Sequence, residues 1–298
     1  MRLKDIGEFG LIKRFQKKIS INSSVVKGSG DDCAVLKFDK SSYQLFTCDM
    51  MVEGVDFSKT ADFKFVGQKA LAISISDIAA CGGVPKHAVV ALGLSRNMQL
   101  HQIDRLAKGL FDLAERFNIN IVGGDISASR KLIIDVSMLG IVEKNKLCLR
   151  QGAKINDMIM VTGEFGGAIK GKHLKFIPRL KEAQFLVNNF KINAMIDVSD
   201  GLVQDLGHIL KQSSVGAVLY ESLIPLSKQA QGIEEALCSG EEFELLFTAP
   251  RDQASKIIKS SKYRFKVIGG IMPESFGLRL INYKNRYSGL KLKGYRHF

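Results

Sequence analysis

Carboxylate side chains recur along this chain beside glycine, serine or threonine, at expected strand ends or in turns. They are Asp31, Asp32, Asp49, Asp77, Asp125, Asp197 and Asp200. Hard cations such as Mg²⁺ prefer oxygen ligands, usually a few carboxylates together with substrate phosphates and water. The set therefore favours a cluster of divalent cations that would collect the phosphates of a nucleotide.

Asp77 differs from the other carboxylates because it lies within the apolar segment ALAISISDIAA, which is expected to form a helix. Burying an unpaired charge costs free energy, so this side chain needs a partner. A buried lysine could supply the opposite charge. A metal ion is the interpretation that we prefer.

The segment IDVSDGL places two carboxylates around a predicted strand end. Asp197 and Ser199 fall on one side of an extended chain because side chains alternate with a period of two. Asp200 and Gly201 then open a predicted helix, whose free N–H groups favour an anion. Taken singly, Asp200 is more simply a helix-capping residue, and Asp125 after Gly-Gly is more simply a turn residue.

The elements that must position these residues alternate between helix and strand, which indicates α/β or α+β layers. Helices are predicted over 8–19, 65–83, 102–118 and 251–260. Strands are predicted over 34–38, 43–50, 87–94, 119–125, 132–143, 216–221, 243–250 and 263–271. Residues 157–171 and 194–214 are each expected to form a strand, a turn and a helix. A boundary near 143–152 predicts an N-terminal domain over 1–145 and a C-terminal α/β domain over 146–298.

The composition is that of a soluble globular protein, with 46% hydrophobic and 24% charged residues among 298. No apolar run reaches the roughly 18 residues of a membrane span, and the start of the chain lacks the apolar core of a signal peptide. The five cysteines are scattered and CxxC is absent, so we expect reduced thiols in a cytoplasmic protein that does not bind a membrane.

The net charge of +13 suggests an anionic partner. Lysine and arginine are spread along the whole chain without a long basic run or interleaved aromatic residues, so nucleic acid is not the expected partner. A lysine-rich surface and polyanionic substrates are the two other interpretations.

In this order, the motifs resemble those of the thiamine-monophosphate kinase family, which belongs to the superfamily of aminoimidazole ribonucleotide synthetase and selenophosphate synthetase. The resemblance covers nearly the whole chain. It runs through GEFGLI, GSGDDCAVL, TCDMMVEGVDF, KALAISISDIAACGGVP, VGGDIS, RQGAKINDMIMVTGEFG, IDVSDGL, DLGHI, SGEEFELLF and GYRHF. The P-loop pattern GxxxxGK[ST] is absent, so the expectation of ATP rests on the family and on the carboxylates.

The resemblance implies a two-domain, aminoimidazole ribonucleotide synthetase-like fold and a homodimer whose N-terminal domains form a β-barrel-like interface. It implies that ATP phosphorylates thiamine monophosphate to thiamine diphosphate by direct in-line transfer, without a phosphoenzyme. Several Mg²⁺ ions per site would neutralise charge, and no side chain would act as a covalent catalyst.

The resemblance also implies roles for single residues. The matches to metal ligands are Asp32, Thr47, Asp49, Asp77, Asp125, Asp197 and Asp200. The matches to ATP contacts are Gly124, Asp125, Arg150 and Ser199. The substrate-binding positions are Asp56, Glu241 and Leu292. The guanidinium of Arg150 also suits a phosphate clamp on its own chemistry.

Two of the substrate-binding positions depart from the family pattern. The family usually has histidine where this chain has Asp56, and often has an aromatic residue where Leu292 stands. Phe57, Phe243 or Tyr295 could stack on the thiamine instead. The leading alternative is therefore a kinase or synthetase of the same superfamily with another phosphate-bearing acceptor. A basic, non-enzymatic module that binds nucleic acid is a third hypothesis, from a different class.

Overall fold

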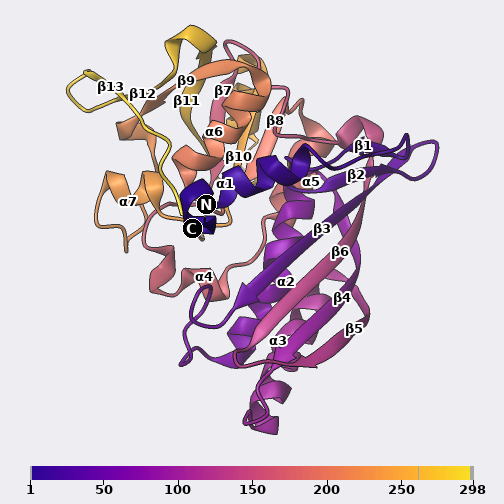
Figure 1. The fold of residues 1–298 in the computed structure, drawn as a ribbon. Coiled ribbons are helices and arrows are strands. Elements are labelled where there is room, and N and C mark those ends of the chain that lie inside the picture. The colour runs from indigo at the N-terminus through magenta and orange to yellow at the C-terminus, as the bar shows by residue number, and fades with distance from the viewer. Residues whose placement is uncertain (1, 261, 296–298) are drawn as a thin grey trace.

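The computed structural model describes residues 2–260 and 262–295, which form two β-sheets with helices between and around them (Figure 1). The first sheet has the order β1-β2-β3-β6-β4-β5. Its strands are β1 (Val25–Lys27), β2 (Ala34–Lys37), β3 (Ser42–Val52), β4 (Val84–Leu94), β5 (Asn120–Ala128) and β6 (Ile133–Glu143). Neighbouring strands are antiparallel except for β4 and β5, which are parallel.

The second sheet has the order β13-β12-β9-β11-β7-β10-β8. Its strands are β7 (Met158–Thr162), β8 (Ala194–Asp197), β9 (Val215–Tyr220), β10 (Leu245–Ala249), β11 (Phe265–Pro273), β12 (Leu278–Ile281) and β13 (Tyr287–Gly289). All pairs are antiparallel except β12 with β9. The predicted division between residues 145 and 146 falls in the connection between the two sheets, and we keep it as a proposal.

Helices cover the sheets unequally. Those of the N-terminal part are α1 (Leu3–Gln16), α2 (Phe63–Ala80) and α3 (Leu100–Phe117), and those that follow are α4 (Lys172–Lys175), α5 (Leu180–Asn189), α6 (Leu202–Ser213), α7 (Ile233–Cys238) and α8 (Arg251–Lys259). Helices α2 and α3 lie on one face of the first sheet (Figure 1). Among the described residues, no helix has both the length and the apolar character to cross a bilayer.

Helix α2 is the centre of the core. It is buried along most of its length because it contacts the first sheet on one side and β8, α4 and α5 on the other. Asp62 caps its start by accepting a hydrogen bond from the Lys64 N–H (3.0 Å). Gly82, at φ +73°, follows its end in the left-handed conformation that glycine favours, as the Gly82–Gly83 pair predicted.

Two predicted elements are wrong in part. The helix expected near the end of 157–171 is only a 3₁₀ turn over Ala168–Lys170, because Gly167 and Gly171 on either side of it have positive φ. The strand expected over 243–250 begins at Leu245, because Phe243 has a φ of +50° and cannot continue an extended ladder. The sequence analysis also missed β1, α5, α7, β12 and β13.

The crossing of α2 and α3 depends on two glycines. A Cβ added at Gly67 would lie 2.1 Å from the Leu106 carbonyl oxygen, and one at Gly109 would lie 1.9 Å from the Lys64 carbonyl oxygen. We expect Gly67→Ala to lower the free energy of unfolding by about 2 kcal/mol, because the helices must separate and the better helix propensity of alanine offsets only part of the loss. Urea unfolding measures this. Gly289→Ala, with open space around its new methyl group, is the matched control, and equal stability of the two variants would contradict the prediction.

Candidate active site

Three carboxylates from separate elements meet on the buried side of α2. Asp32 precedes β2, Asp77 lies in α2, and Asp197 ends β8. Each offers one oxygen, and these oxygens all lie within 4.8 Å of one another. Thr47 of β3 donates its hydroxyl hydrogen to Asp77. The structure thus brings together four of the seven predicted metal ligands.

Serine hydroxyls of α2 hold Asp197 and one further carboxylate, Asp49, in place. Ser74 Oγ donates to Asp49 (2.7 Å), and Ser76 Oγ donates to Asp197 (2.6 Å). Both serines are fully buried. The sequence analysis did not assign them a role, although two hydroxyls in an otherwise apolar helix were the available signal. Asp49, which is on β3, therefore lies beside the carboxylate group, next to the turn of α2 that bears Ser74.

Burial raises the pKa of these carboxyls, and their mutual repulsion raises it further. The pKa of Asp197 is about 7, through burial and the charge of Asp32. Burial raises the pKa of Asp49 to about 6. The pKa of Asp77 lies well above its ordinary value, first through burial and then through Asp49 and Asp197. A divalent cation would relieve this repulsion.

Arg150 is the cation that faces the group. Its guanidinium donates to Asp32 Oδ1 through Nη2 (2.6 Å) and Nε (3.2 Å), and its backbone N–H donates to Asp31 (3.2 Å). Lys27 Nζ lies 3.7 Å from Asp31. The other oxygen of Asp32, Oδ2, is buried and has no hydrogen-bond partner among the described residues. The donor set and this open oxygen fit a hard cation.

The turn before α6 corrects the simpler interpretation of Asp200. Helix α6 has Gly201 as its capping residue, and the Asp205 carboxylate accepts from the N–H groups of Asp200 (3.1 Å) and Gly201 (3.0 Å). Asp200 thus precedes the capping residue and is not the helix cap, and the buried Asp205 carboxylate holds the turn through these two donors. The carbonyl of Ser199, a predicted ATP contact, accepts from the Glu241 N–H (2.7 Å).

Asp125 lies away from the carboxylate group. It is exposed on β5, three strands from β3, which corresponds to about 14 Å at the usual strand spacing. The strand register places Gly124 in one row with Val90 and Asp49, and residues of one row share a face of the sheet. Because side chains alternate along a strand, Asp125 lies on the face opposite to that of Asp49. A Cβ at Gly124 would lie 1.8 Å from the Val90 carbonyl oxygen, which explains this glycine by strand packing.

Two predicted substrate-binding residues meet at a buried lysine. Lys69 of α2 is 1% exposed; its Nζ donates to the Asp56 carbonyl oxygen (2.9 Å) and pairs with the Glu241 carboxylate. The Asp56 carboxylate accepts from the Val52 N–H (2.7 Å), so it bonds to the backbone of the turn in which it lies. His173 Nδ1 lies 3.3 Å from Lys69 Nζ. The sequence analysis missed Lys69 and His173; a lysine within an apolar helix was the available signal for the first.

Leu292 and Tyr295 occupy different places. Leu292 packs over α6, where a Cβ added at Gly207 would meet it at 2.6 Å. The backbone N–H of Tyr295 donates to the Asp200 carbonyl oxygen (2.9 Å). Burial raises the pKa of the Tyr295 hydroxyl, and the nearby charges of Asp56 and Glu241 raise it further. The Tyr295 hydroxyl therefore lies within range of the charges of two predicted substrate-binding residues.

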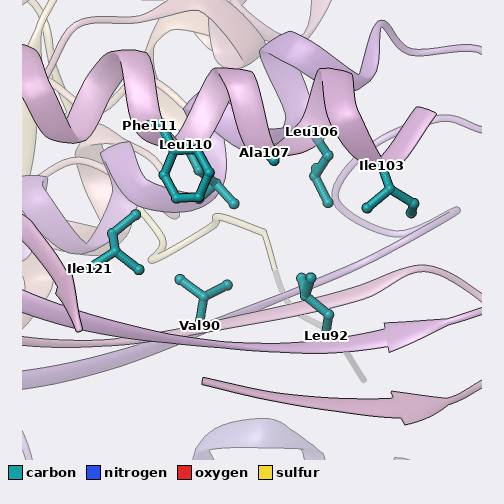
Figure 2. Close-up of a pocket in the computed structure, with 8 residues that line it drawn as sticks. All are labelled: Val90, Leu92, Ile103, Leu106, Ala107, Leu110, Phe111 and Ile121. Carbon is teal, nitrogen blue, oxygen red and sulfur yellow. The ribbon is translucent and has the colours of Figure 1, made fainter. Parts of the chain in front are cut away.

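An apolar cavity of about 120 Å³ lies between α3 and the strands β4 and β5 (Figure 2). Leu106 and Phe111 point into it from the helix, and Val90 and Ile121 point into it from the strands. All of its lining residues are apolar. Such a surface offers nothing to a phosphate or a cation, so this cavity is separate from the chemistry of the carboxylates.

Two family models match the chain: the AIR synthase related protein N-terminal domain over residues 30–142, and the corresponding C-terminal domain over residues 152–279. The thiamine-monophosphate kinase of Buchnera aphidicola (Schizaphis graminum) is 33% identical, with 99% of each chain covered. That of Bacillus subtilis is 31% identical, over 98% of this chain and 99% of the relative. The structure of AaThiL complexed with AMPPCP and TMP superposes with a TM-score of 0.88 at 29% identity, covering 100% of this chain and 99% of that one.

The raised carboxyl pKa values predict how the metal-free protein responds to pH. With a pKa of about 7, Asp197 in the native state still holds protons near pH 6.5 that the unfolded state has released, so stability falls as the pH rises, and the raised pKa of Asp77 acts in the same direction. His208, whose pKa burial lowers to about 4, has the opposite effect, but only below its ordinary value of 6.5. In EDTA we expect Tm to fall between about pH 6.5 and pH 8, and added Mg²⁺ to reduce the fall. A Tm that rises over this interval in EDTA would contradict the assignment.

Proposed function

The chain belongs to the thiamine-monophosphate kinase family, and from this membership we propose that it transfers the γ-phosphoryl group of ATP to the phosphate of thiamine monophosphate, giving ADP and thiamine diphosphate. The observation that carries the proposal is the buried group of Asp32, Asp77 and Asp197 beside the Arg150 guanidinium. Carboxylates that can hold divalent cations, next to a cation that can hold phosphate, are what phosphoryl transfer requires.

The carboxylate group would hold Mg²⁺. The open Oδ2 of Asp32 and the raised carboxyl pKa values of Asp77 and Asp197 support this role. A bound cation would give the oxygen a partner and would stabilise the ionised form of the carboxylates. Mg²⁺, when bound, would neutralise the charge of the ATP phosphates. Arg150 would orient those phosphates through its planar guanidinium.

We propose that the transfer is direct. Burial raises the pKa of the nearby Cys33 thiol well above its ordinary value, and raises that of Cys148 to about 12. Neither thiol therefore forms the thiolate that a covalent step would need. All five cysteines are free thiols, which also supports a cytoplasmic location.

For the acceptor, we propose Glu241 and Tyr295 as the contacts. Glu241 keeps an exposed part of its carboxylate while it pairs with Lys69. Tyr295 takes the aromatic role that Leu292 cannot fill from its position over α6. A flat aromatic ring suits the cationic thiazolium ring of thiamine.

A second candidate is a kinase or synthetase of the same superfamily that acts on another phosphate-bearing acceptor. It is favoured by Asp56, whose carboxylate is bound to the backbone of its own turn and is not turned toward a ligand. Binding of ATP without formation of thiamine diphosphate would select this candidate.

The test is an end-point assay with ATP, Mg²⁺ and thiamine monophosphate, in which the thiamine esters are separated by chromatography. We expect thiamine diphosphate only when Mg²⁺ is present, and we expect Asp77→Asn to abolish it, because one carboxylate of the cation site is lost. Asp252→Asn, which changes an exposed side chain outside the site, should keep full activity. Normal turnover of Asp77→Asn would refute the metal site.

We also propose that the protein is a homodimer joined through the uncovered face of the first sheet, in a β-barrel-like interface. Phe46, Met50 and Val89 expose 42%, 59% and 42% of their surface on this face, where Asp125 also lies. Such an apolar face favours association. Asp125 is too far from the carboxylate group of its own chain, so its proposed role as a ligand for Mg²⁺ and ATP requires a second copy.

Light scattering coupled to size-exclusion chromatography tests the dimer. We expect wild-type protein to have twice the mass of one chain, and Met50→Lys to shift it to the single-chain mass, because a charge in an apolar interface loses its hydration. Tyr283→Lys is the matched control, since Tyr283 is 70% exposed in the loop between β12 and β13. A wild-type monomer, or an unchanged dimer of Met50→Lys, would contradict the interface.

A further inference from the structure

The buried ion pair of Lys69 and Glu241 has a third member that the proposed function does not use. His173 Nδ1 lies 3.3 Å from Lys69 Nζ and 3.7 Å from Glu241 Oε2, and its side chain is 9% exposed. With the Asp56 carbonyl, the ammonium group thus has a neighbour for each of its three hydrogens. A lysine surrounded in this way cannot turn toward a ligand, so its function is to hold its partners.

The segment that bears His173 is fastened to the segment that bears Glu241 at several points. Lys172 Nζ donates to Glu242 (3.0 Å) and to Glu244 (2.9 Å). Arg179 holds Glu244 through Nε (2.6 Å) and Nη2 (2.8 Å). The buried position of both glutamates makes these pairs expensive to break from one side. These ion pairs therefore hold the segment over 172–179 in place beside Glu241.

Ring stacking adds a further contact between the same two segments. Phe176 stacks on Phe243, with ring centroids 4.2 Å apart and an interplanar angle of 9°. The backbone at Glu241 and Phe243 is strained, with φ of +68° and +50°. Strained residues of this kind persist where the surroundings hold them and are common at ligand sites. The contacts made by residues 172–179 hold Glu241 and Phe243 in this strained conformation.

The position of the Glu241 carboxylate suits a cationic ligand. It is 27% exposed, so part of it faces outward. Burial raises the pKa of Glu241, but the contact with His173 and the charge of Lys69 lower it by more, and the carboxylate stays ionised. An ionised carboxylate held at the edge of a pocket binds a positive group or an N–H donor.

We propose that His173 is a positioning residue that, together with Lys69, aims the Glu241 carboxylate at the cationic, nitrogen-bearing part of the acceptor. The inference rests on the proposed function, in which the acceptor is thiamine monophosphate with its thiazolium and amino groups. His173 acts through Glu241 and has no role in binding ATP. Removal of the His173 side chain therefore weakens the binding of the acceptor and leaves the binding of ATP unaffected.

The experiment measures kcat, and KM for thiamine monophosphate and for ATP, in wild type, His173→Leu, His173→Asn and His173→Gln. Leucine removes the polar contact, and glutamine carries its amide at the position of the imidazole Nε2, not at that of Nδ1, which makes the contact. We expect both to raise KM for thiamine monophosphate about tenfold, which is the size of one charge-assisted hydrogen bond, with KM for ATP within about twofold of wild type. Asparagine, whose amide takes the position of Nδ1 and can contact the ion pair again, should restore most of the affinity. His101→Leu, on the exposed surface of α3, is the matched control.

Thermal melts identify any variant that does not fold. If one of the two variants that are expected to raise KM is unfolded, the KM values of the other one test the proposal. An unchanged KM for thiamine monophosphate would overturn the proposal, as would an equal rise in both KM values, because a general loss of structure affects both substrates. Asparagine as poor as leucine would overturn the positioning role. These outcomes differ from failure of the proposed function, in which wild type itself forms no thiamine diphosphate and the inference falls with it.

Discussion

Repulsion among buried carboxylates is the constraint on which this structure depends. Asp32, Asp77 and Asp197 offer oxygens within 4.8 Å of one another, with Asp49 beside them, and burial raises the pKa of all four. A flexible chain would separate these groups. They stay together because each comes from a different rigid element, and the elements are fixed by packing against α2. The hydrophobic core therefore maintains an arrangement that is electrostatically unfavourable in the absence of a cation.

Helix α2 also fixes the separation between the carboxylate group and the ion pair of Lys69 and Glu241. It presents Asp77 to the cation site and Lys69 to Glu241, eight residues apart, which is about 12 Å along a helix. Both side chains are on buried parts of one straight element, so the separation cannot change without moving the core. A substrate with a phosphate at one end and a cationic ring system at the other can span such a distance. In the proposed function, the helix would thus set the length of the acceptor.

The sequence predicts what depends on local chemistry and fails where distant segments meet. The argument that a carboxylate within an apolar helix needs a partner led to Asp77, and it applied equally to Lys69, which was overlooked. The role of His173 could not be predicted, because its contact with Lys69 joins residues 104 positions apart. The interpretation of Asp200 as a helix cap failed because the local pattern does not reveal that Gly201 is the capping residue and that Asp205 holds the turn before it.

The two halves of the site differ in how their charges are balanced. The carboxyls around Asp77 have raised pKa values, which shows that the protein does not supply enough positive charge for them. Glu244 is also buried, and burial raises its pKa, but Arg179 and Lys172 lower it by more. The buried Glu244 is therefore balanced by cations of the protein itself, whereas the carboxyls around Asp77 are not. Rigidity beside Glu241 and a site that depends on a cation beside Asp77 suit a reaction in which one substrate is recognised by shape and charge, and the other by the metal that accompanies it.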